Sequence, residues 1–153
     1  MCTGIAITLS EVPAPLVEVL PGNIHTRGPQ QELQFHWRQS PSLLPVWWEG
    51  SIQLLRWGNK NRRSPLPYGG WIDRERIETG CLAHMAPVEV VIPANMAHHR
   101  GTWFLVEEGL VGVVLPEVPG GPVVYLLTVP ATNYYRNMTG QSMTMPVFVN
   151  QII

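Results

Sequence analysis

The chain has 153 residues, and its ten Lys and Arg and eleven Asp and Glu give a formal net charge of −1. This length predicts a single domain over residues 1–153, and the small net charge excludes a protein that is basic throughout. Only two cysteines are present, residues 1–26 contain no Lys or Arg, and no apolar run is long enough to span a bilayer. We therefore expect a cytoplasmic protein without a disulfide framework or a membrane anchor.

Short apolar runs dominate the chain, and its 14 Gly and 15 Pro favour turns over long helices. Strands are predicted at residues 5–9, 43–48, 52–57, 88–92, 102–106, 110–115, 123–129 and 147–149. Glu49-Gly50-Ser51 predicts a hairpin between the second and third strands, and Glu107-Glu108-Gly109 predicts a tight turn. Residues 59–70 are typical of a long irregular loop, and residues 133–141 favour no element. We expect an α+β domain dominated by a curved antiparallel sheet or barrel, with few short helices.

Met1-Cys2 is the most reactive feature of the sequence. Methionine before a small residue is readily removed, and Cys2 would then carry a free α-amine and a free thiol. The amine has a pKa of about 7.7–8.0, and the thiol is a strong nucleophile once deprotonated. Such an aminothiol condenses with an aldehyde to a thiazolidine, or its thiol attacks an acyl group with the amine as base. The structural alternative is a small apolar residue that opens the first strand.

A basic segment lies between residues 56 and 76, where the only acids are Asp73 and Glu75. Arginine predominates in it, which suits forked hydrogen bonds to phosphate. Aromatic residues within the segment offer surfaces on which unpaired bases stack. The predicted DNA contacts are Arg56, Arg62, Arg63, Trp71, Arg74 and Arg76. The alternative is a solvated loop that carries its share of charge.

Several motifs, taken together and in order, resemble the SOS-response-associated peptidase (SRAP) family over nearly the whole chain. The matching pieces are Met1-Cys2, Leu44-Pro45-Val46 before the hairpin, Arg56-Trp57-Gly58, Arg76-Ile77-Glu78-Thr79, Val91-Ile92-Pro93-Ala94 and Met145-Pro146-Val147. The resemblance implies an SRAP-like fold and a role in the SOS response to DNA damage. It also implies that the chain removes its own Met1 and traps abasic sites in single-stranded DNA through a Cys2 thiazolidine.

Three supporting positions of the family are replaced. The family Asn falls on Arg74, the catalytic Glu falls near His99, and the His before Met-Pro falls on Ser142. His98 and His99 have the unperturbed pKa, about 6.5, that suits proton transfer, so we predict catalytic roles for Cys2, His99 and His98. The alternative for the two histidines is a pair of exposed loop imidazoles. Cys81 and His84 lack the paired spacing of a structural zinc site, and we expect no metal or cofactor.

Two other functions remain open from the sequence. A catalytically degenerate SRAP fold that binds nucleic acid or a protein explains the replaced residues. An N-terminal-nucleophile Cys amidohydrolase also begins in a way similar to Met1-Cys2-Thr3-Gly4, although the resemblance ends within about seven residues and this chain looks short for that two-sheet fold. We predict that Cys2 lies near the mouth of a groove lined by residues 56–76. Oligomeric state and enzymatic activity are left open by the sequence.

Overall fold

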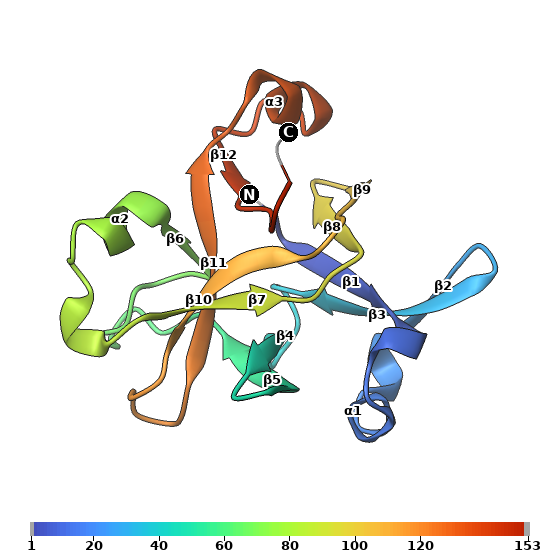
Figure 1. Cartoon of the computed structure of the whole chain (residues 1–153), viewed down its shortest axis with the longest axis horizontal. Helices are drawn as coiled ribbons and strands as arrows, with labels where there is room; N and C mark the ends of the chain where they lie inside the picture. Colours follow the sequence, from blue (N-terminus) through green and yellow to red (C-terminus); the bar gives the residue numbers. More distant parts are fainter. Residues whose placement is uncertain (1, 152–153) are drawn as a thin grey trace.

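Strands are the predominant regular elements of the computed structural model, which describes residues 2–151 (Figure 1). One sheet has five strands, in the order β2 (Ile24–Arg27), β3 (Gln30–His36), β1 (Gly4–Thr8), β8 (Met96–His99) and β9 (Thr102–Leu105). The second sheet has seven, in the order β10 (Leu110–Leu115), β7 (Val88–Ile92), β4 (Leu43–Trp48), β5 (Ser51–Trp57), β11 (Val123–Pro130) and β12 (Thr144–Pro146), with β6 (Trp71–Asp73) also paired to β11. The helices are short: η1 (Leu9–Glu11), α1 (Ala14–Glu18), η2 (Pro21–Asn23), α2 (Arg74–Glu78), η3 (Ala83–Met85) and α3 (Asn133–Met138).

The second sheet closes on itself, because β10 pairs with β11 as well as with β7. Five strands thus form a barrel, which removes the exposed edges that an open sheet would present. Strand β11 is buried along residues 123–128. Alternate residues of β11 belong to two separate apolar clusters, one on each face. This double burial explains why β11 reads as a continuous apolar run rather than an alternating one.

The expected mostly β fold with few short helices is confirmed, and most predicted strands are present. The hairpin of β4 and β5 forms around Glu49 and Gly50, with Trp48 opposite Ser51. The turn at residues 107–109 does not join a hairpin, because β9 belongs to one sheet and β10 to the other. The predicted strand at 147–149 is wrong. The last strand is β12, and beyond it Phe148 makes only an isolated bridge to Leu110.

Five strands were missed, namely β2, β3, β6, β8 and β12. In β3 the apolar residues Leu33 and Phe35 alternate with polar ones, so it is a strand with one apolar face. Helix α3 falls in the segment that favoured no element, and the Thr132 side chain caps it by accepting a hydrogen bond from the amide of Tyr135 at 3.2 Å. Neither β3 nor α3 contains the continuous apolar run on which the strand predictions were based.

Strand β1 is the middle strand of the five-stranded sheet, paired with β3 on one side and β8 on the other. The residues that precede β1 therefore enter the molecule between two strands. Helix α3 and strand β12 lie together at the end of β11, on the side of the molecule where β1 begins (Figure 1). Within the described range, none of the helices has the length and apolar character needed to cross a bilayer.

Candidate functional site around Cys2

Cys2 is a core residue. Its side chain is only 1% exposed and belongs to the larger apolar cluster, and its thiol donates a hydrogen bond to the carbonyl of Gly4 at 3.1 Å. Burial raises the pKa of the thiol to about 11, so it is protonated at neutral pH. The prediction that Cys2 lies near the mouth of a groove is wrong, because pairing at the start of the central strand draws the residue inside.

Three segments fix the main chain at this position. The Thr3 amide donates to the His98 carbonyl at 2.8 Å, and the Thr3 carbonyl accepts from the Trp37 amide at 2.9 Å. The indole Nε1 of Trp71 donates to the Cys2 carbonyl at 2.8 Å. Cys2 is therefore held by β8, by the turn after β3 and by β6, and not by its own strand alone.

Trp71 is half-buried and belongs to a cluster of three tryptophans. Its ring centroid lies 5.2 Å from that of Trp37 and 5.8 Å from that of Trp57. The Trp57 indole donates to the Gly70 carbonyl at 2.9 Å. A Cβ at Gly70 would lie 2.6 Å from Trp57 Nε1, so this close approach requires glycine. The sequence proposed Trp71 as a DNA contact, and in the structure it positions the backbone of Cys2.

His98 and His99 are adjacent on β8 and therefore point to opposite faces of the sheet. His98 is half-buried, and its Nδ1 lies 3.3 Å from the Thr3 hydroxyl. Burial is the main cause that lowers the pKa of His98. His99 is 2% exposed, and its ring meets that of Tyr135 edge-on at a centroid distance of 6.1 Å. The alternative of exposed loop imidazoles is wrong, since both residues are in a strand and neither is exposed.

Tyr135 is the functional candidate that the sequence did not reveal. It is fully buried in the same cluster as Cys2, and its hydroxyl has no hydrogen-bond partner within residues 2–151. Burial raises the pKa of this phenol, and the negative charge of a Cys2 thiolate raises it further. The two groups are therefore within electrostatic reach of each other. The only sequence signal was the pair Tyr134-Tyr135 in a segment that favoured no element.

An unpaired buried hydroxyl is unusual, because leaving one without a partner costs about 1–3 kcal/mol. A buried hydroxyl of this kind is a candidate for a functional role. The raised pKa of Tyr135 keeps its phenol protonated at neutral pH, so the hydroxyl is available as a hydrogen-bond donor. Cys2 and Tyr135 thus place a thiol and a phenol in one apolar cluster, and the His99 imidazole packs on the phenol ring; we call these three residues the enclosure around Cys2.

The basic segment is spread over several elements, and three of its arginines have partners within the protein. Arg56 donates to the Gly121 carbonyl at 2.8 Å, the Arg62 guanidinium lies 4.1 Å from the Tyr68 ring centroid, and Arg74 pairs with Glu89 at 3.6 Å. Arg63 and Arg76 are exposed in the loop before β6 and in α2. These contacts leave fewer free guanidinium groups than the sequence suggested.

The three residues that the resemblance aligned with the SRAP Asn, Glu and His make contacts within the protein. Arg74 makes the ion pair just described, His99 packs on Tyr135, and the buried Ser142 hydroxyl donates to the Thr144 carbonyl at 2.7 Å. No group of three His, Cys, Asp or Glu side chains with metal-binding geometry occurs in the part of the chain that the structure describes. Comparison of the chain with protein-family models, curated proteins and solved structures finds no match. The functional argument therefore rests on the residues around Cys2.

Proposed function

We propose that this chain is an SRAP-like protein that traps abasic sites in single-stranded DNA through Cys2 once Met1 has been removed. Met1 itself lies outside the described residues. The observation that carries the proposal is the enclosure around Cys2, in which the fully buried Tyr135 hydroxyl has no partner within residues 2–151. Trp71 supports it by fixing the Cys2 carbonyl at 2.8 Å. The resemblance in motif order supplies the class of substrate.

The reaction begins at the amine of Cys2 rather than at its thiol. The α-amine is partly neutral near pH 7.7–8.0, whereas the thiol has a pKa of about 11. The amine adds to the open-chain sugar aldehyde and forms a carbinolamine. Tyr135 donates a proton to the carbinolamine oxygen, one water leaves, and an iminium remains. Reaction at the amine first fits a site in which the thiol is buried and neutral.

Ring closure completes the chemistry. The thiol sulfur bonds to the iminium carbon and releases its proton, which returns to the Tyr135 oxygen. The phenol is then regenerated, and the net reaction joins the aldehyde and the aminothiol with loss of one water. Burial raises the pKa of both groups, so each is protonated when the reaction begins. His99, packed on the Tyr135 ring, lies beside this proton path.

The second candidate is a catalytically degenerate member of the same fold that binds nucleic acid or a protein. The 1% exposure of the thiol favours it, as does the engagement of Arg74 with Glu89 at the position of the family Asn. An amidohydrolase is the weakest of the three, since direct attack on an amide needs thiolate at neutral pH and a pKa of about 11 leaves little.

Intact mass of the freshly expressed protein distinguishes these functions. The protein is measured before and after incubation with three single strands of one sequence: an undamaged strand, one with an abasic site, and one whose abasic aldehyde has been reduced to an alcohol. We expect loss of Met1 and a DNA-sized adduct with the abasic strand alone. Cys2→Ala should abolish the adduct, and Cys81→Ala, which changes the other cysteine, should retain it. A retained Met1 without any adduct in a folded sample, or an adduct that persists in Cys2→Ala, contradicts the proposal.

A further inference from the structure

A second polar region lies on the five-stranded sheet immediately beside Thr3. Its rings come from three strands: the centroid of His36 lies 5.7 Å from that of His98 and 5.8 Å from that of Trp103, and His98 lies 4.8 Å from Trp103. The Thr3 hydroxyl is 3.3 Å from His98 Nδ1. Only one residue separates Cys2 from this region.

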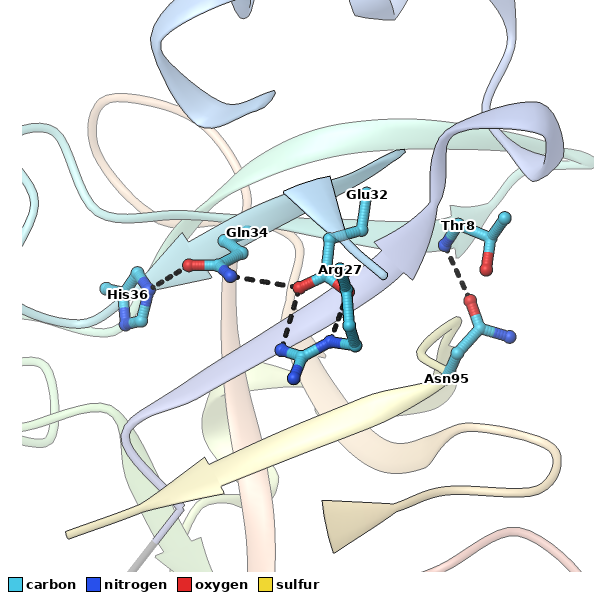
Figure 2. Close-up of polar contacts among 6 residues, drawn as sticks. All are labelled: Thr8, Arg27, Glu32, Gln34, His36 and Asn95. Atoms are coloured by element: carbon cyan, nitrogen blue, oxygen red, sulfur yellow. Dashed lines mark hydrogen bonds and ion pairs between the residues drawn. The ribbon is translucent and has the colours of Figure 1, made fainter. Parts of the chain in front are cut away.

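A chain of hydrogen bonds along β3 holds His36 in place (Figure 2). Glu32 accepts two bonds from Arg27, at 2.6 and 2.9 Å, and one from the Gln34 amide nitrogen at 2.9 Å. A carboxylate only accepts, so the Gln34 oxygen must face the other way, toward His36 Nε2 at 3.0 Å. Nε2 of His36 therefore carries a proton, and the position of the ring is set by residues that the sheet fixes.

Glycine at position 4 allows His36 to lie against the central strand. A Cβ at Gly4 would be 2.8 Å from His36 Nδ1, so any larger residue would push the imidazole away. The arrangement is thus built by the register of β1 with β3, in which Gly4 faces His36. It is not an accident of an exposed loop.

Arg38 supplies the charge of this region. It is exposed and, among the residues that the structure describes, has no hydrogen-bond or ion-pair partner. It lies close enough to His36 and His98 to lower the pKa of both, after the larger effect of burial. The acid that belongs to the same network, Glu32, is already engaged by Arg27. Arg38 is therefore exposed beside two half-buried imidazoles, and no carboxylate within residues 2–151 is bonded to any of the three.

We propose that Arg38 and His98, named here together with the adjoining His36 the Arg38 surface, bind the phosphate backbone of a single strand as it approaches Cys2, with His36 held beside them by its bond to Gln34. Arginine and imidazole donate to phosphate oxygens, and positively charged surfaces of this kind position a strand without reading its bases. The Arg38 surface takes the role that the sequence gave to residues 56–76, where Arg56, Arg62 and Arg74 have partners within the protein. The identity of the strand as DNA rests on the proposed function.

The test measures binding of an undamaged, fluorescein-labelled single-stranded oligonucleotide by anisotropy, in a Cys2→Ala background that cannot crosslink. Arg38→Gln removes one positive charge, and the double variant Arg62→Gln with Arg63→Gln removes two. We expect Arg38→Gln to weaken binding about tenfold at 50 mM salt, as for a lost charged hydrogen bond, and to flatten the slope of log K against log salt by about 0.7. The double variant should stay within about twofold.

Each outcome decides between the two surfaces. The inference is overturned if the double variant weakens binding as much as Arg38→Gln, if Arg38→Gln binds normally, or if the Cys2→Ala protein fails to bind at 50 mM salt. Thermal denaturation checks that each variant is folded, which we expect because Arg38 is exposed. An undamaged strand has no aldehyde, so this result is independent of whether Cys2 reacts. Failure of the mass experiment alone would leave the Arg38 surface standing as the site of a non-catalytic module.

Discussion

Replacement of Tyr135 by Phe tests the enclosure around Cys2 with the loss of one atom. The hydroxyl is fully buried and unpaired within residues 2–151, a state that costs about 1–3 kcal/mol. Phenylalanine keeps the ring, and with it the edge contacts to His99 and Phe104 at centroid distances of 6.1 and 5.7 Å. We therefore expect Tyr135→Phe to raise the free energy of unfolding by about 1–2 kcal/mol. The corresponding rise in Tm is about 2–4 °C for each kcal/mol.

Urea unfolding followed by tryptophan fluorescence measures this change. Tyr134→Phe is the matched control, because Tyr134 is 65% exposed and its hydroxyl is solvated. That variant should stay within about 0.5 kcal/mol of the parent. Tyr135→Phe should also slow adduct formation with abasic DNA by at least about a hundredfold, the usual loss for a general acid. A less stable Tyr135→Phe would mean that the hydroxyl is paired, and a normal rate of adduct formation would exclude Tyr135 as the proton donor.

Two further predictions concern burial in the core. Because burial raises the pKa of the Cys2 thiol from 9.0 to about 11, its thiolate fraction at pH 8 is about a hundredfold below normal, so iodoacetamide should alkylate the exposed Cys81 and spare Cys2. The Cys2 thiol of the unfolded chain loses its proton at a lower pH than the buried thiol of the folded chain. The protonated thiol therefore contributes up to about 3 kcal/mol to the free energy of unfolding below pH 9, and this contribution should be lost as the pH rises from 9 to 11. Urea titrations of Cys2→Ala should lack that loss. Equal labelling of both cysteines in the folded chain, read by peptide mass spectrometry, would contradict the burial. Gly70→Ala should cost about 1–3 kcal/mol and reduce the near-ultraviolet circular dichroism of the tryptophans, because its Cβ would lie 2.6 Å from Trp57 Nε1. Gly22→Ala, whose Cβ meets nothing within 4 Å, should change neither quantity.

The sequence predicted strands well where apolar residues are continuous, as in β4, β5, β10 and β11. It missed β2, β3, β6, β8 and β12, because these strands are short or have a polar face and therefore contain no long apolar run. The closure of the barrel could not be derived from the sequence either. It depends on β10 pairing with both β7 and β11, and periodicity within a strand does not specify its neighbours.

The sequence by itself determined the chemical inventory of the candidate site. It showed a cysteine one residue from the start, two adjacent histidines and an excess of arginine between residues 56 and 76. These follow from residue types and order, which need no fold. The sequence did not identify Arg38 or Tyr135 as candidate functional residues, because neither lies in a recognisable motif.

Only the tertiary structure decided which of these groups meet. Pairing of β1 between β3 and β8 buries Cys2 and sets His99 on the inner face and His98 on the outer face. Packing of α3 brings Tyr135 into the same apolar cluster as Cys2 from 133 residues away, and partners elsewhere in the fold engage Arg56, Arg62 and Arg74. The physical reason is that burial and ion pairing depend on distances in space, and a low-dielectric interior changes the pKa of a group according to what surrounds it there.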